Sequence, residues 1–188
     1  MSEANNNAAA AAATQRAGAP RLLPVGASGW RWLPLTAAVI VVDYIAKAWI
    51  IHHFALFERV HVLPVLDIIL TYNTGAAFSF LAEASGWQRW LFVLLALAVS
   101  TALIVWLRRL SARRHALLAC GLALIVGGAL GNMLDRLLRG RVVDFIHVHW
   151  RHAYFPAFNV ADSAITIGAV LLLVDAWLET RAARRIRS

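Results

Sequence analysis

The chain has 188 residues, of which 61% are hydrophobic and 15% are charged. This balance is too apolar for an ordinary soluble protein, and the length suits a single domain. The net charge of +8 would suggest nucleic acid in a soluble protein. Here the arginines flank apolar segments, so we expect membrane topology to account for them and no nucleic-acid partner. The single cysteine, Cys120, lies in an apolar segment, and we expect a buried, inert thiol.

Apolar segments of membrane-spanning length follow a tail of low complexity. Residues 1–30 are rich in asparagine and alanine, so we expect a disordered tail. Four later segments approach the roughly 20 residues that cross a hydrocarbon layer about 30 Å thick. These segments are Leu33–Ile51, Trp90–Leu107, Ala116–Leu134 and Val160–Leu178. We therefore predict an all-α membrane protein, with a four-helix bundle over residues 31–179 and a basic cytoplasmic tail over residues 180–188.

The basic residues predict how the chain crosses the membrane. If all four segments span, eleven arginines lie on the side of the two termini and six lie on the other side. Cytoplasmic loops carry the excess of basic residues. We therefore expect both termini in the cytoplasm and the two longer connections on the outer side.

The two outer connections contain strand-like sequence. His61–Tyr72 is rich in β-branched residues and precedes a turn signal at Asn73–Gly75, and Val142–Ile146 is a second β-branched run. The first connection also has many apolar residues, so we expect it to lie on the membrane surface. We predict a small β-like subdomain at the outer interface.

Two carboxylates occupy unusual positions on this outer side. Asp144 interrupts the run Val142–Ile146, and Asp162 lies one turn into the last apolar segment. A carboxylate beside hydrocarbon is costly, so two at neighbouring membrane boundaries indicate a functional site. Asn159 could instead be a helix N-cap with Asp162 at position N3, where the helix dipole favours a negative charge. Each Asp could be structural alone, but the outward placement of both favours a site.

Further polar residues recur at helical spacing. Asp43 and Lys47 are four residues apart in the first segment, so they share a helix face and can form an ion pair. The same spacing near the end of the third segment relates Asn132 to Arg136 and Asp135 to Arg139. Such residues either solvate the helix end or position groups near the carboxylates, and for Arg136 we favour structural support.

Histidines and a serine lie close to the two carboxylates. His147, His149 and His152 form an HxHxxH pattern, and alternation places His147 and His149 on one strand face, so zinc is conceivable. Because no carboxylate at a suitable spacing completes the set, we interpret them as interfacial polar groups and expect no metal or other cofactor. Ser163 has no evident base, and we interpret it as part of a helix cap.

Two carboxylates held about 3 Å apart cannot both ionise, so they share one proton. One can then act as general base toward a water molecule while the other acts as general acid toward a carbonyl group. This pair would hydrolyse an amide without a metal or a covalent intermediate.

Five motifs in the chain resemble the lipoprotein signal peptidases, the type II signal peptidases of bacteria. The motifs are DYIAK (Asp43–Lys47), YNTGAAF (Tyr72–Phe78), GGALGNMLDR (Gly127–Arg136), VVDF (Val142–Phe145) and FPAFNVADS (Phe155–Ser163). They occur in the order that the family has, and the resemblance runs from about residue 33 to residue 178.

The resemblance implies an aspartic endopeptidase of the bacterial cytoplasmic (inner) membrane. Such enzymes remove the signal peptide from prolipoproteins whose cysteine carries a diacylglyceryl group, cleaving on the amino side of that cysteine. The Asp residues of the VVDF and NxADS motifs form the family's catalytic dyad, and here they are Asp144 and Asp162. Further motif residues that support the fold or the site are Asp43, Lys47, Asn73, Gly75, Asn132, Arg136 and Asn159. The resemblance also implies contact with membrane lipids and inhibition by globomycin-type cyclic peptides, and we expect a monomer.

Two other classes of function are compatible with individual residues. Asp43, Lys47 and Asp162 could form a proton relay or transport path, although the four segments show no inverted repeat. The histidines of residues 147–152 could belong to a metallohydrolase.

Overall fold

Four long helices dominate the structure, a computed structural model that describes residues 24, 27–74, 86–151 and 153–187. The helices are α2 (Leu33–His53), α3 (Trp87–Arg109), α4 (Ala116–Arg139) and α5 (Val160–Arg187). Each contains a stretch that is long and apolar enough to cross a membrane, which confirms the four predicted segments. The helices extend beyond the predicted bounds because tryptophan and arginine at their ends suit the membrane–water interface.

Helix α4 is the centre of the bundle. It packs against α2, α3 and α5, and half of its membrane-spanning stretch is buried inside the protein, against 17–28% for the other three helices. Gly128 allows the closest of these approaches, because a Cβ atom there would collide with the backbone carbonyl of Ala161 in α5. This contact holds the first turn of α5 directly against α4.

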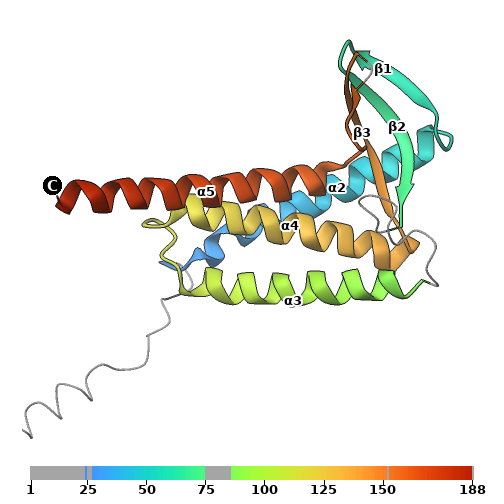
Figure 1. The fold of residues 1–188 in the computed structure, drawn as a ribbon. Helices are drawn as coiled ribbons and strands as arrows, with labels where there is room; N and C mark the ends of the chain where they lie inside the picture. Colours follow the sequence, from blue (N-terminus) through green and yellow to red (C-terminus); the bar gives the residue numbers. More distant parts are fainter. Residues whose placement is uncertain (1–23, 25–26, 75–85, 152, 188) are drawn as a thin grey trace, which may run out of the picture.

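A four-stranded antiparallel sheet lies at one end of the bundle (Figure 1). Its strands, in spatial order, are β1 (Arg59–Leu63), β2 (Leu66–Asn73), β3 (Val142–Trp150) and β4 (Ala153–Tyr154). The strands confirm the predicted β-like subdomain, but the stretch predicted as one strand-like run forms two strands joined by a tight turn at residues 64–65. The pairing of β2 with β3 joins the two outer connections into one sheet.

Apolar side chains attach the sheet to the bundle. Ile50 of α2 packs with Leu70 of β2 and with Val143 and Phe145 of β3 in one buried cluster. Outside this cluster, a cavity of about 570 Å³ between α2 and the sheet has an almost wholly apolar lining. These surfaces agree with a subdomain that lies against the membrane surface.

The turn that leads from α4 into the sheet depends on one glycine. Gly140 follows the last residue of α4 with φ +76°, a left-handed conformation that glycine adopts without the steric cost other residues incur. Its N–H donates to the carbonyl of Arg136 at 3.1 Å, which closes the helix. Strand β3 starts two residues later and carries Asp144 back toward the helices.

The other end of the bundle contains the start of α2 and the C-terminal end of α5 (Figure 1). The short 3-10 helix η2 (Gly29–Trp32) precedes α2, and Ser28 before it is fully buried beside Ser111 in the connection between α3 and α4. The predicted tail over residues 1–30 therefore has an ordered end, and its remainder is outside the described residues apart from residue 24. Helix α5 continues without a break through the predicted basic tail, residues 180–187.

Candidate active site

The N-terminus of α5 is built by a reciprocal cap. The side chain of Asn159 accepts a hydrogen bond from the N–H of Asp162 at 2.9 Å, and the Oδ2 atom of Asp162 accepts one from the N–H of Asn159 at 3.2 Å. This geometry confirms the predicted N-cap and N3 positions and satisfies two backbone donors that the helix leaves free. It also points one carboxylate oxygen of Asp162 away from the backbone, toward the interior of the bundle.

Asp144 reaches the same place from strand β3. Its side chain is only 3% exposed, and its Oδ1 atom accepts a hydrogen bond from Nδ2 of Asn159 at 2.7 Å. The side chain of Asn73, at the end of β2, also donates to this carboxylate. Burial and then the negative charge of Asp162 raise the pKa of Asp144 to about 6, although both amide donors oppose the shift. The structure therefore brings Asp144 and Asp162 together on the two sides of Asn159.

Asn132 of α4 connects this pair to the interior of the bundle. Its Nδ2 atom donates to Oδ1 of Asp162 at 2.8 Å, while its Oδ1 atom accepts from the ammonium group of Lys47 at 3.0 Å. An ammonium group can only donate, so Lys47 fixes which end of the amide faces it. Lys47 therefore orients the Asn132 NH₂ group toward Asp162.

Lys47 is the fully buried centre of an ionic network. Its nitrogen lies 2.7 Å from Oδ2 of Asp43 and 3.0 Å from Oδ2 of Asp135, in addition to its bond with Asn132. These three acceptors match the three ammonium hydrogens. Asp43 also accepts a hydrogen bond from the N–H of Ala161 at 2.9 Å, so α2 caps the first turn of α5. The predicted Asp43–Lys47 ion pair is confirmed.

Asp135 is a member of the network that the sequence did not reveal. Its carboxylate pairs with Lys47 of α2 and Arg139 of α4, and it accepts the N–H of Val143 at 3.1 Å. The pairing with Arg139 agrees with the spacing of four residues seen in the sequence. The contacts with Lys47 and Val143 join elements that are distant in the chain, and no local pattern predicts them.

Three other residues singled out in the sequence are Arg136, Ser163 and Gly75. Arg136 donates to the backbone carbonyl of Asn132 at 3.2 Å and places its guanidinium group 4.9 Å from the ring centre of Phe92, which agrees with structural support. Ser163 donates to the carbonyl of Asn159 at 2.9 Å, as a helix residue does. Gly75 lies outside the described residues.

The histidines lie in a different part of the sheet. His147 and His149 share a strand face, as alternation predicted, and both face Asp67 of β2. The sequence interpretation missed this carboxylate because it comes from the other outer connection. Asp67 and His149, together with His61, could hold a metal ion. His152 is outside the described residues.

Amide groups make the direct side-chain hydrogen bonds to Asp144 and Asp162, and the charges of Lys47 and Arg136 act on the pair from farther away. Among the described residues, the ion pairs of buried carboxylates involve Asp43, Asp67 and Asp135. A paired lysine or arginine would hold a carboxylate in its ionised form, whereas an amide orients it and leaves a proton easier to retain. This arrangement favours one shared proton between Asp144 and Asp162.

A cavity opens beside the pair. It has a volume of about 470 Å³ and is lined by Phe155, Phe158, Asp162, Ser163, Thr166 and Ile167. Its wall is apolar except near the first turn of α5. The cavity suits an extended or helical apolar peptide whose backbone passes the carboxylates.

Comparison with known proteins identifies the family. The sequence model of signal peptidase II matches residues 35–178. The lipoprotein signal peptidase of Pseudomonas aeruginosa is 55% identical over 146 residues, which cover 77% of this chain and 86% of that protein. The lipoprotein signal peptidase of Shewanella sp. (strain MR-4) is 50% identical over 155 residues, which cover 82% of this chain and 91% of that protein.

The fold leads to the same group of proteins. A bacterial membrane enzyme solved by the in meso method at 2.3 Å resolution matches with a TM-score of 0.72 and 29% identity, over 87% of this chain and 94% of the other. A similar structure at 1.9 Å resolution matches with a TM-score of 0.68 and 28% identity, over 84% and 96% of the two chains. The chain belongs to the signal peptidase II family of membrane aspartic peptidases.

Proposed function

We propose that this membrane peptidase removes the signal peptide from diacylglyceryl-modified prolipoproteins and that Asp144 and Asp162 are its catalytic dyad. The observation that supports this most directly is the bridge through Asn159, whose backbone N–H donates to Asp162 and whose side chain donates to Asp144. Cleavage on the amino side of the lipid-modified cysteine would release the signal helix into the membrane.

The two environments suggest how the dyad divides the work. Asp144 is buried and its pKa is raised to about 6, so it is the member of the pair that we assign the shared proton in the active form, up to about pH 6. Asp162 is partly exposed to the cavity of about 470 Å³, so it is placed to take a proton from the attacking water. The water oxygen adds to the scissile carbonyl carbon while Asp144 protonates the carbonyl oxygen.

Collapse of the resulting gem-diol breaks the C–N bond. The leaving nitrogen takes a proton from Asp162, and Asp144 recovers its own from a diol hydroxyl, so the dyad ends with one proton as it began. No covalent bond to the enzyme forms in this sequence. Asn132, Asn159 and Asn73 keep the two carboxylates in position throughout, which removes the need to order them during the reaction.

The depth of the site agrees with a lipid-anchored substrate. The dyad lies at the sheet end of the bundle, where α4 ends and α5 begins. The excess of arginines at the opposite end supports cytoplasmic termini and a dyad near the outer leaflet of the inner membrane. A substrate anchored by its acyl chains and signal helix would present its scissile bond at this depth. A globomycin-type cyclic peptide would inhibit by covering the two carboxylates, and one chain is sufficient to form the site.

The direct test is cleavage of a diacylglyceryl-modified prolipoprotein by the purified enzyme in detergent or lipid. We expect Asp144→Asn and Asp162→Asn each to lower kcat by at least about 10³-fold, because neither variant can both accept and donate the required protons. Asp175→Asn, the same substitution farther along α5, is the matched control and should keep full activity.

Two further measurements complete the test. Thermal unfolding and membrane insertion should show that the inactive variants are folded. A metal chelator should leave wild-type cleavage unchanged, since the dyad activates water by itself. Retained cleavage in either dyad variant would contradict the assignment, and loss of activity in chelator combined with active dyad variants would favour a metallohydrolase.

A further inference from the structure

One face of the sheet gathers an acidic residue and three histidines from three adjacent strands. Asp67 of β2 is directly opposite His61 of β1 and directly opposite His147 of β3. Directly opposed residues of antiparallel strands place their side chains on the same face. His149, two residues beyond His147, points to this face as well.

The distances within this cluster are those of potential ligands. The Oδ1 atom of Asp67 lies 2.6 Å from Nδ1 of His61 and 3.3 Å from Nε2 of His149. One donor atom from each of the three residues lies within 4.8 Å of the others. Nδ1 of His147 is 3.9 Å from the second oxygen of Asp67. The donor atoms of His61, Asp67 and His149 therefore converge on a volume the size of one ion, with His147 beside it.

The hydrogen bonding of this cluster is incomplete. Asp67 is fully buried, and neither its Oδ2 atom nor Nδ1 of His147 has a hydrogen-bond partner among the described residues. Buried polar atoms are rarely left without a partner, and a bound ion is one recognised reason for such atoms. Arg59 approaches Oδ2 at 3.7 Å, which is beyond hydrogen-bond distance. The guanidinium group balances part of the charge without satisfying the oxygen.

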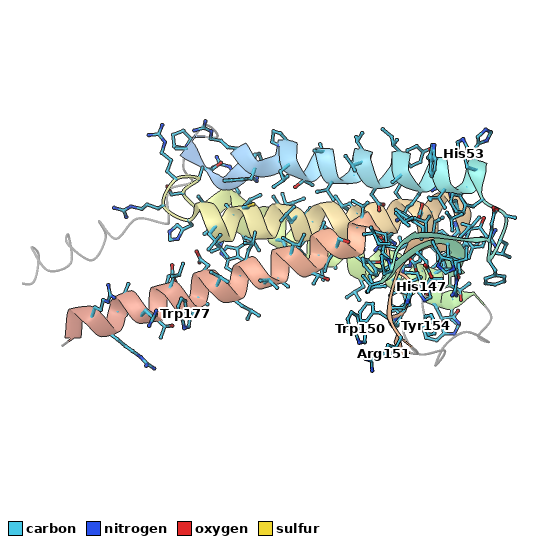
Figure 2. All side chains as sticks on the ribbon, turned by 90° about the horizontal axis from the view of Figure 1, so that it is seen from above. His53, His147, Trp150, Arg151, Tyr154 and Trp177 are labelled. Carbon is cyan, nitrogen blue, oxygen red and sulfur yellow. The ribbon has the colours of Figure 1, made fainter. Side chains whose placement is uncertain are left out.

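The cluster is covered on one side and open on another. The ring of Tyr154 in β4 stacks on the ring of His147, with 5.5 Å between their centres, and its centre lies 5.6 Å from that of His149. His147 and Tyr154 appear together at the sheet end of the molecule (Figure 2). The side chain of His61, by contrast, is 76% exposed. An ion could therefore enter past His61 and rest on a buried floor formed by Asp67 and His149.

We propose that His61, Asp67 and His149 bind one divalent transition-metal ion of the Zn²⁺ class, with His147 available as a fourth ligand. Two or three imidazole nitrogens with one carboxylate oxygen are a donor set that zinc prefers, whereas Ca²⁺ and Mg²⁺ require mostly oxygen. Ligand bonds of about 2.0–2.2 Å require His61 to move back from its direct contact with Asp67, which an exposed side chain can do.

The proposed ion would have a structural role and not a catalytic one. It would connect β1 and β2 of the first outer connection with β3 of the second. His149 is five residues beyond Asp144 on β3, a separation of about 16 Å along a strand. The inference therefore does not depend on the proposed function of the dyad.

The test is a titration of the full chain with Zn²⁺, using protein purified in detergent with an affinity tag that contains no histidine and treated first with a chelator. Isothermal titration calorimetry should show one ion bound per chain. His61→Ala and His149→Ala should each weaken the affinity at least about tenfold. His53→Ala, which removes an exposed histidine at the end of α2, is the matched control and should leave the affinity unchanged.

A second readout separates specific ligation from surface binding. Zn²⁺ should raise the unfolding temperature of the wild type and of His53→Ala, but raise it much less in His61→Ala and His149→Ala, because binding to the folded state stabilises it. The exposure of His61 makes its alanine variant safe for folding. The proposal is overturned if no stoichiometric binding occurs, or if both cluster variants bind Zn²⁺ as tightly as the control.

Discussion

Asp144 and Asp162 have the same side chain but different surroundings. Asp144 is buried on a strand and its pKa is raised to about 6, whereas Asp162 caps the first turn of a helix and lines a cavity. When two carboxyl groups meet in environments this different, the more buried one keeps the proton. The division of labour proposed for the dyad follows from this difference.

The pH dependence of cleavage should report this shared proton. Because the active enzyme carries one proton on the dyad and Asp144 has a pKa of about 6, kcat/KM should fall about tenfold per pH unit well above pH 6. Bound substrate excludes water and raises the pKa further, so the corresponding limb of kcat should lie at higher pH. A kcat/KM that stays constant from about pH 5 to 8 would contradict a raised pKa on the proton donor.

The same pKa shift predicts the stability of Asp144→Asn. The pKa of Asp144 is raised from 3.8 to about 6 on folding, so the folded protein binds the proton more tightly than the unfolded chain does. The wild type therefore loses stability as pH rises through this interval, by up to roughly 3 kcal/mol. The Asn variant lacks this loss, so it should unfold at a higher temperature than the wild type at pH 8.

This gain should disappear below pH 3.8, where the carboxyl is mostly protonated in both states. Thermal unfolding in detergent at several pH values measures the difference. Asp175→Asn is again the control, and it should show a much smaller pH-dependent gain. An Asp144→Asn variant that is less stable than the wild type at pH 8 would show that hydrogen bonds of the ionised carboxylate outweigh its burial.

At the scale of elements, buried charges hold three helices and a strand in register. Asp43 and Lys47 come from α2, Asp135 from α4, and their bonds reach the N–H groups of Ala161 in α5 and Val143 in β3. Arg139 supplies the second positive charge, so two carboxylates face two cations. The network therefore holds the start of α5, which carries Asp162, and the start of β3, which carries Asp144.

Removing the central cation should disrupt this balance. Lys47→Met leaves two carboxylates, Asp43 and Asp135, with one cation of the network, Arg139. It also removes the ammonium donor that orients the amide of Asn132. We expect a loss of about 3–5 kcal/mol in the free energy of unfolding, as for other buried pairs that lose one partner, together with reduced cleavage. Denaturant unfolding in mixed micelles measures the first effect.

The double variant Asp43→Asn/Lys47→Met provides the control for charge. It removes one charge of each sign and leaves the Asp135–Arg139 pair, so it should be more stable than Lys47→Met alone. If the double variant is the less stable of the two, the charge balance is not what makes Lys47 important.

At the scale of the whole molecule, the sheet lies at one end of the bundle, and the start of α2 and the C-terminal end of α5 lie at the other (Figure 1). The arginine excess lies at the latter end, and the dyad lies with the sheet. Trp150 on the sheet and Trp177 near the far end of α5 show this separation (Figure 2). The orientation in the membrane therefore decides which compartment the dyad faces.

Cysteine labelling can determine this orientation. In a Cys120→Ser background, Trp150→Cys places a thiol at an exposed position on the sheet, and Arg113→Cys places one in the exposed connection between α3 and α4. A membrane-impermeant maleimide should label the first variant in intact spheroplasts. It should label the second only after the membrane is permeabilised. The reverse pattern would place the dyad on the cytoplasmic side.

Features that depend on neighbouring residues were predictable from the sequence. The four helices follow from apolar length, the Asn159–Asp162 cap from a spacing of three residues, and the Asp43–Lys47 pair from a spacing of four. These predictions use only the geometry of one helix or the cost of placing a charge in lipid. The choice of Asp144 and Asp162 as a pair also uses the family motifs.

Contacts between distant segments required the tertiary structure. The ion pair of Asp135 with Lys47 and the meeting of Asp67 with His147 and His149 join parts of the chain far apart in sequence. They depend on the register of β2 against β3 and on the close packing of α4 against its neighbours. A shift of one residue in that register would move Asp67 to the other face of the sheet, and no local spacing encodes which register forms.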